Sequence, residues 1–327
     1  MGLQVGIDLG GTNIAGGIVS EEGKVLCRQS VPTGQGCSPE RIADQIAALC
    51  RELVQESGIA WQSVQWIGVG VPGSVEKKTG TVEYANNINF VQVPLRQMLE
   101  ERLNCRAYIE NDANSAAWGE YQIGAGKGCS SMVMLTLGTG IGGGIIENGR
   151  LLSGCNGAAG ELGHFVLDLK GKPCNCGLRG CFEQYGSVTA LIEQTKFAMR
   201  TTPDSLMHRW AAEHGGCVDG RTPFEAMRAG DSAAKKVVQA YVRYLCLGIT
   251  SIINIFHPEM LCLGGGISRE GETLLGPVRA FAAQHGYARG SVRQTRIAAA
   301  VLQNDAGVIG AALLGKEQEA ERQMPIV

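Results

Sequence analysis

Residues 3–33 have the sequence LQVGIDLGGTNIAGGIVSEEGKVLCRQSVPT, which decides the expected fold. Two apolar runs meet at Gly10 and Gly11, and a third run follows the polar turn at residues 21–23. Short apolar runs bounded by glycine turns are typical of β-strands. We therefore expect the chain to begin with three strands joined by tight turns.

Strand and helix patterns alternate beyond this segment. A helical pattern covers Pro39–Glu56, and the apolar segment 63–73, SVQWIGVGVPG, predicts a buried strand. The segment 105–112, CRAYIEND, predicts another strand, and residues 113–124, ANSAAWGEYQIG, predict a helix directly after it. This alternation indicates an α/β domain.

The second half of the chain repeats the opening order. Residues 132–152, MVMLTLGTGIGGGIIENGRLL, contain an apolar strand, a Gly/Thr turn, another strand and a turn at Asn148-Gly149. Residues near 190–250 are helical, and residues 259–268, EMLCLGGGIS, predict a strand with a glycine turn. The segment 305–315, DAGVIGAALLG, predicts a small-residue helix packed closely on a neighbour. We expect two related α/β domains, residues 1–118 with about 304–327, and residues 119–303.

Composition excludes several classes of protein. The 327 residues are 44% hydrophobic and 18% charged, and the formal net charge is −2, which argues against broad binding to nucleic acid or anionic membranes. We expect no signal peptide and no membrane span, because neither a basic start nor about 18 uncharged apolar residues in a row occurs. Twelve cysteines then indicate a reducing compartment, the cytoplasm, where their spacing points to metal or redox chemistry.

Three glycine turns have the pattern of phosphate-binding loops. Successive glycines let backbone N–H groups point into a concave nest that suits an anion, and a threonine hydroxyl adds a donor. Asp8, before the first turn, is placed to orient hydrated Mg²⁺. The residues expected at the nucleotide are Asp8, Gly10, Gly11, Thr12, Asn13, Thr136, Gly138, Thr139, Gly140, Gly265 and Gly266.

Each turn also has a purely structural interpretation. The first can be a plain hairpin in which glycine supplies a positive φ. The second has a G-x-G-x-G-G pattern like that of a dinucleotide-binding fold, but an apolar strand follows it instead of a helix. The third can be a merely structural turn. Two strand–turn–strand hairpins and a later glycine turn together favour an ATP site.

A separate segment has the spacing of a metal site. His164, Cys174, Cys176 and Cys181 form the pattern H-x9-C-x-C-x4-C. Three thiolates and one imidazole complete a tetrahedral set for Zn²⁺ and leave no open position, so the metal should be structural. The alternative is that these are free or redox-active cysteines.

The segment 160–187, GELGHFVLDLKGKPCNCGLRGCFEQYGS, together with DLGGTN, resembles the ROK family of repressors, open-reading-frame proteins and kinases. The resemblance extends from Asp8 to residue 315. It implies an actin-like ATPase fold, in which two ribonuclease-H-like domains flank a nucleotide and sugar cleft. The family's repressors carry a helix-turn-helix domain ahead of the first phosphate motif. That motif begins at Asp8 here, so we expect a kinase, and a homodimer or homotetramer.

The resemblance also implies a sugar site. The Asp of an E-N-D element, here Asp112, would act as general base on the sugar hydroxyl. Asp112 could instead be only an N-cap, and a helix N-terminus should favour its carboxylate form. His164 would bind zinc through one ring nitrogen and donate to the sugar from the other. The implied sugar-binding residues are Gly73, Asn87, Asn111, Asp112, Glu161, His164 and Glu183.

Two points in this assignment stay open. The family often has Pro before the sugar-binding Asn, where this chain has Asn86, so either Asn86 or Asn87 can face the sugar. The glutamates could also be plain surface residues.

We expect transfer of the γ-phosphoryl group of ATP to the 6-hydroxyl of a hexose, with Mg²⁺. Glucose is the first choice, and N-acetylmannosamine, fructose or another hexose is the alternative. A non-catalytic sugar sensor is the alternative from another class. The intact phosphate turns with Asp8 and Asp112 argue against the sensor, since it need not keep them.

Overall fold

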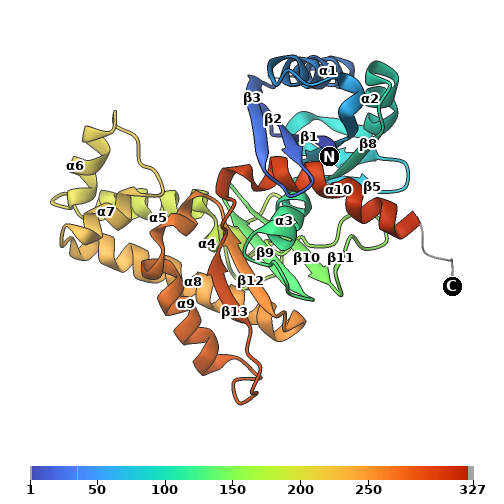
Figure 1. Cartoon of the computed structure of the whole chain (residues 1–327). Helices are drawn as coiled ribbons and strands as arrows, with labels where there is room; N and C mark the ends of the chain where they lie inside the picture. Colours follow the sequence, from blue (N-terminus) through green and yellow to red (C-terminus); the bar gives the residue numbers. More distant parts are fainter. Residues whose placement is uncertain (1, 35, 323–327) are drawn as a thin grey trace. The chain divides into compact units, whose positions relative to one another are not determined.

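The computed structural model describes residues 2–34 and 36–322 and is a mixed α/β structure, as the sequence predicts (Figure 1). The chain forms two compact units. Unit 1 comprises Met1–Met132, Gly144–Gly160 and Val301–Val327, and unit 2 comprises Val133–Gly143 and Glu161–Ala300. The domain division expected from sequence, at residues 118/119 and 303/304, stays a prediction.

A five-stranded sheet in the order β3-β2-β1-β4-β8 forms the centre of unit 1. The strands β1 and β2 form the hairpin expected at Gly10 and Gly11, and β4 and β8 extend the sheet in parallel to β1. The three predicted opening strands are therefore confirmed. The bounds are β1 Leu3–Leu9, β2 Asn13–Ser20, β3 Val25–Pro32, β4 Val64–Val71 and β8 Ala107–Asn111.

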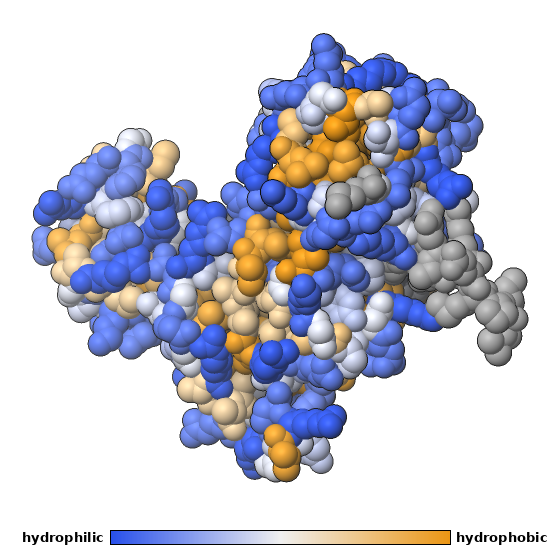
Figure 2. All heavy atoms as spheres, viewed as in Figure 1, coloured by the Kyte–Doolittle hydropathy of each residue, from blue (hydrophilic) through white to orange (hydrophobic). Residues whose placement is uncertain are grey.

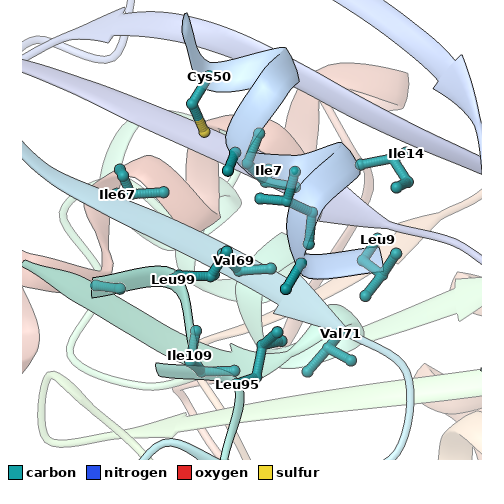
Figure 3. Packing of buried hydrophobic residues seen from close by; sticks show 14 of the residues in the cluster. Ile7, Leu9, Ile14, Cys50, Ile67, Val69, Val71, Leu95, Leu99 and Ile109 are labelled. Carbon is teal, nitrogen blue, oxygen red and sulfur yellow. The ribbon is translucent and has the colours of Figure 1, made fainter. Parts of the chain in front are cut away.

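Helices α1 (Pro39–Glu56) and α2 (Leu95–Leu103) cover one face of this sheet (Figure 1). The bounds of α1 match the predicted helix, and the side chain of Ser38 caps its N-terminus by accepting from the Arg41 N–H. Figure 3 shows the core under these helices, where side chains from the strands and both helices meet. Ile7 and Ile109, fully buried there, each contribute about 1.5–3 kcal/mol.

Helices α3 (Asp112–Ile123) and α10 (Ala306–Arg322) cover the other face. The approach is very close, because a β-carbon on Gly68 would lie 1.7 Å from the carbonyl oxygen of Ala311. A β-carbon on Gly310 would lie 1.6 Å from the carbonyl oxygen of Ser115. The predicted small-residue helix is thus confirmed, and glycine is required at both contacts.

A small three-stranded sheet in unit 1 was not predicted. It comprises β5 (Ser74–Glu76), β6 (Thr81–Ala85) and β7 (Phe90–Val93), in the order β5-β6-β7. A single turn of 3₁₀-helix, Asn86–Ile88, joins the last two strands. Strands of three to five residues are too short to show a clear alternation of apolar and polar side chains. Helix α2 was missed as well.

The second large sheet has the order β11-β10-β9-β12-β13. Counted along the chain, this repeats the third-second-first-fourth-fifth arrangement of the first sheet, so the internal repeat seen in the sequence is a repeat of topology. Asn148 and Gly149, with φ of 51° and 78°, form the predicted turn. The bounds are β9 Met132–Leu137, β10 Ile141–Glu147, β11 Arg150–Leu151, β12 Met260–Gly264 and β13 Arg296–Ala299.

Helices make up most of the rest of unit 2. Helix α8 ends at Phe256 before Pro258, as predicted, and α9 was missed because Pro277 lies inside it. By length and composition α8 could cross a membrane, but 56% of its apolar stretch is buried in the structure, as in a core helix. The bounds are α4 Glu183–Gly186, α5 Val188–Thr201, α6 Leu206–Glu213, α7 Thr222–Arg228, α8 Ser232–Phe256 and α9 Glu272–His285.

Three further 3₁₀ segments, Trp61–Ser63, Gly266–Glu270 and Gln303–Asp305, complete the described elements. Hydrophilic residues cover most of the surface displayed in Figure 2, with smaller apolar areas between them.

The close contact of α10 with α3 gives a first prediction. Gly310→Ala should lower the free energy of unfolding by about 3 kcal/mol, because the new methyl group meets backbone that cannot rotate away. Urea unfolding followed by circular dichroism measures the change. Gly290→Ala is the control, since nothing lies within 4 Å of a β-carbon there, and it should change stability by only about 0.5 kcal/mol. Equal effects of the two substitutions would contradict the close-packing argument.

Candidate functional site

The first glycine turn is closed by backbone hydrogen bonds in unit 1. The Gly10 N–H donates to the Asn13 carbonyl at 2.9 Å, and the Thr33 N–H donates to the Thr12 carbonyl at 2.9 Å. Neither Gly10 nor Gly11 is among the described glycines with positive φ. The interpretation that glycine is there to supply a positive φ is therefore wrong for this turn.

Asp8 and Asp112 are two half-buried carboxyl groups near this turn. Burial raises the pKa of Asp8 to about 6, and the negative charge of Asp112 adds to the rise. Burial also raises the pKa of Asp112, against the opposing hydrogen bond from the Ala113 N–H at 2.8 Å. The expectation that the helix N-terminus dominates at Asp112 is thus wrong in direction, because desolvation outweighs it. A pair of repelling carboxylates favours a hard divalent cation or a proton.

Asn111, and not Asp112, is the N-cap of α3. Its side-chain oxygen accepts from the Asn114 N–H at 3.1 Å, while its Nδ2 donates to the Gly73 carbonyl at 2.9 Å. Asp112 is the first residue of the helix itself. The capping alternative for Asp112 is therefore wrong, which leaves its carboxylate available for chemistry. Asn111 also ties the Gly73 turn to the start of α3.

Gly73 and Asn87 lie on the same side of unit 1. Gly73 has a φ of 97°, and a β-carbon on it would lie 2.0 Å from the Tyr84 carbonyl oxygen, so glycine is required. The Tyr84 hydroxyl donates to Asn86 Oδ1 at 3.4 Å, whereas Asn87 packs against the position of Gly11. The exposed Asn87 is therefore the asparagine that lies beside the first glycine turn.

The second glycine turn, in unit 2, is held by a glutamate. The Gly138 N–H donates to the Gly140 carbonyl at 3.0 Å. Oε2 of Glu183 accepts from the Ile141 N–H at 2.9 Å, and a β-carbon on Gly140 would lie 2.4 Å from that oxygen. Sequence reasoning assigned Glu183 to the sugar and missed this bond. No local sequence signal could reveal it, because the two residues are 42 positions apart.

The third glycine turn packs against the strand that leads into the second. Gly265 has a φ of 87°, and a β-carbon there would lie 2.1 Å from the Leu137 carbonyl oxygen. Gly266 has nothing within 4 Å of a β-carbon. Gly265 thus allows the close packing against Leu137, and Gly266 leaves open space beside the turn.

The four predicted metal ligands come together in unit 2. Their ligand atoms all lie within 4.8 Å of one another. The sulfurs of Cys176 and Cys181 are 3.5 Å apart, and Cys174 Sγ is 3.6 Å from His164 Nδ1. A tetrahedral zinc ion with ordinary bond lengths would separate two sulfurs by about 3.8 Å, and sulfur from nitrogen by about 3.6 Å. The described donors therefore fit Zn²⁺.

The backbone around these ligands is tightly turned. Gly177 and Gly180 have φ of 92° and 74°, and a β-carbon on Gly180 would lie 1.6 Å from the Asp168 carbonyl oxygen. Burial raises the pKa of Cys181 to about 12. A bound cation is what would stabilise its thiolate, since metal coordination deprotonates a thiol.

His164 has its two ring nitrogens on different neighbours. Nδ1 faces the cysteine sulfurs, and Nε2 lies 3.9 Å from Oε2 of Glu161. The side chain of Glu161 is 58% exposed. The Glu183 N–H donates to the Gly163 carbonyl at 2.9 Å, so the cysteine-rich segment also holds Glu183. The tautomer of the His164 ring and the positions of Glu161 and Glu183 thus depend on one loop.

The predicted site residues fall into two groups, one in each unit. In unit 1 they are Asp8, Gly10, Gly11, Thr12, Asn13, Gly73, Asn87, Asn111 and Asp112. In unit 2 they are Thr136, Gly138, Thr139, Gly140, Glu161, His164, Cys174, Cys176, Cys181, Glu183, Gly265 and Gly266.

Comparison with known proteins identifies the family of this chain. The sequence profile of the ROK family matches residues 4–318. A glucokinase of Streptomyces coelicolor is 37% identical, over 98% of this chain and 99% of its own length.

Two solved structures are also similar. A ROK family glucokinase from Streptomyces griseus, in complex with glucose and AMPPNP, has a TM-score of 0.83 and 36% identity, over 97% of this chain and all of that one. A ROK hexokinase from Thermus thermophilus has a TM-score of 0.79 and 34% identity, over 98% and 99%. Because profile, sequence and structure agree over nearly the whole length, this chain belongs to the ROK family and has its actin-like ATPase fold.

Proposed function

We propose that this chain is an ATP-dependent hexose kinase that phosphorylates the 6-hydroxyl of glucose. The observation that carries the proposal is the Asp8–Asp112 pair beside the first glycine turn, because a sensor of sugar needs neither carboxylate. The relatives named glucokinase, and the similar structure that holds glucose and AMPPNP, support the same reaction.

Asp112 is the proposed general base. Its raised pKa makes it a better proton acceptor than an ordinary aspartate, and its carboxylate lies at the end of β8, where α3 begins. The sugar oxygen would attack the γ-phosphorus, its proton would pass to Asp112, and the bond to the β-phosphate oxygen would break to release ADP. The transition state is loose, so positioning contributes more than base strength.

The glycine turns and Asp8 would serve the nucleotide. Backbone N–H groups of the turns would bind phosphate oxygens, which carry most of the charge. Mg²⁺, when bound, neutralises phosphate charge, and the carboxylate of Asp8 is the group we assign to orient it.

The sugar would be held by the side chains that the family resemblance implies. Glu161, His164 and Glu183 would pair with hydroxyl groups, and Asn87 and the Gly73 turn would complete the contacts. Glu183 has one oxygen bonded to the Ile141 N–H, so Oε1 is the oxygen we assign to the sugar. Hydroxyl-bonding groups of this kind reject analogues that lack the hydroxyl. We further propose a cytoplasmic homodimer or homotetramer.

A hexose panel tests the reaction and its substrate. ADP release, coupled to NADH oxidation, is measured with Mg-ATP and glucose, mannose, fructose, N-acetylmannosamine and 6-deoxyglucose. We expect the highest kcat/KM with glucose and none with 6-deoxyglucose, which lacks the accepting hydroxyl. Preference for N-acetylmannosamine would reassign the substrate. No turnover with any hexose would leave the non-catalytic sugar sensor as the remaining interpretation.

Asp112→Asn tests the base. It should keep glucose affinity but lower kcat by about 10²–10⁴-fold, because the amide cannot accept the proton. Steady-state kinetics and calorimetric glucose binding measure the two quantities. Asp44→Asn removes an exposed carboxylate that pairs with Arg102 and serves as the control, with kcat unchanged. Near-normal turnover of Asp112→Asn would remove Asp112 from this role.

Metal analysis tests the cysteine cluster. The purified protein should contain about one zinc per chain, and Cys181→Ser should lose it together with a few kcal/mol of stability. Cys217→Ser, at an exposed cysteine outside the cluster, should keep the metal. Wild-type protein that is folded, active and free of zinc would show that the cluster is not a structural metal site.

A further inference from the structure

Unit 1 contains a cavity of about 410 Å³ that the proposed reaction does not use. Three segments line it: the turn after β5 with Glu76, Lys77 and Lys78, the loop after β11 with Ser153, and α10 with Gln318. None of the residues assigned to the nucleotide, the sugar or the zinc ion lines it. Its volume is in the range of pockets that hold small molecules.

Gln318 lines this cavity and carries a buried amide group. The residue is 5% exposed, and its Oε1 accepts from Arg96 Nη2 at 3.3 Å. A guanidinium has only donors, so the amide oxygen must face Arg96 and the Nε2 group must face away from it. Nε2 is buried and has no hydrogen-bond partner among the described residues. A buried donor without a partner costs about 1–3 kcal/mol, which an unseen acceptor would recover.

Ser153 adds a second group of the same kind. Its hydroxyl oxygen is buried and, within the part of the chain that the structure describes, has no hydrogen-bond partner. The two residues come from segments 165 positions apart, Gln318 on α10 and Ser153 after β11, yet they line one cavity. Two such groups at one cavity indicate a ligand that carries hydrogen-bond acceptors.

The charge around the cavity favours an anion. Lys77 and Lys78 line it, and Arg96 fixes their turn by donating to both of their carbonyl oxygens, at 3.0 and 2.7 Å. Glu76 is the one acidic residue among the lining residues described, and its carboxylate already accepts the N–H groups of Lys78 and Thr79. Phosphate groups combine negative charge with several acceptor oxygens, and so match a lining that carries two lysines and two side-chain donors.

We propose that this cavity is a second, non-catalytic site for a small phosphate-bearing metabolite. Gln318 Nε2 and the Ser153 hydroxyl would donate to its oxygens, and Lys77 and Lys78 would balance its charge. The site does not depend on the proposed kinase activity.

The position of the cavity gives the ligand a means to act on the sugar site, a consequence that rests on the proposed function. The strand β5 begins directly after Gly73, and the loop after β11 leads along the chain to Glu161. A β-carbon on Gly157 would lie 2.0 Å from the Val75 carbonyl oxygen, so the two segments are in contact. A ligand held by both would change the sugar's KM more than kcat.

The test uses Cys155, an exposed residue that lines the cavity, as a local reporter. Alkylation by iodoacetamide is followed by peptide mass spectrometry with inorganic phosphate, glucose 6-phosphate or glucose added to the full chain. Glucose 6-phosphate at ten times its Kd should slow alkylation of Cys155 by about tenfold, by mass action. Exposed Cys217 should react at an unchanged rate. Phosphate alone should protect more weakly.

Two variants and a control sharpen the result. Gln318→Glu keeps an oxygen for Arg96 but replaces the donor with a negative oxygen, and should weaken protection by at least about tenfold. Ser153→Ala should weaken it while folding normally. Gln62→Glu makes the same change of charge at an exposed residue outside the cavity and should leave protection intact.

Three results would overturn the proposal: no protection by either phosphate compound, equal protection by glucose, or protection that both variants retain. Failure of the hexose panel would leave this experiment unaffected, because alkylation of Cys155 does not depend on turnover.

Discussion

The close approach of α10 to glycines of the first sheet is the constraint on which unit 1 depends. β-carbons on Gly6 and Gly68 would lie within 2 Å of carbonyl oxygens of α10, so the helix backbone rests directly on the strands. The same helix brings Gly307, in its first turn, against the carboxylate of Asp8. Its contact at Gly310 fixes α3, whose first residue is Asp112. The close packing therefore helps to fix where both half-buried carboxylates lie.

In unit 2 the corresponding constraint is the cysteine-rich loop. It orients the ring of His164 and holds the backbone of Glu183 through the Gly163 carbonyl. Glu183 in turn accepts from the N–H of Ile141, at the second glycine turn. One carboxylate thus connects the loop that would bind metal to the turn that would bind phosphate. A change in the cysteine-rich loop would therefore alter the second glycine turn, where we propose that the nucleotide binds.

Much of the fold and of the candidate site could be predicted from the sequence, because the patterns that indicate them are local. The opening hairpin, α1 and the zinc ligands each depend on apolar runs, glycine positions or ligand spacing within one short stretch of the chain. The bond from Asn111 to the Gly73 carbonyl and the bond from Ile141 to Glu183 depend on how distant segments pack. The raised pKa of Asp112 depends on burial, which a motif does not show. The sheet β5-β6-β7 was not predicted, because its strands are too short to show a periodic pattern.

The placement of α10 also has a consequence for biosynthesis. Unit 1 is built from the first and the last parts of the chain, whereas most of unit 2 lies between residues 161 and 300. On a translating ribosome the strands β1 and β4 are made early, but the helix that covers their glycines is made only after residues 161–300 of unit 2. The face that α10 will cover must stay open while unit 2 and its cysteine loop are synthesised. The usual order, in which the N-terminal domain folds first, therefore does not apply to this chain. Unit 1 can be completed only after residues 161–300 of unit 2 have been synthesised.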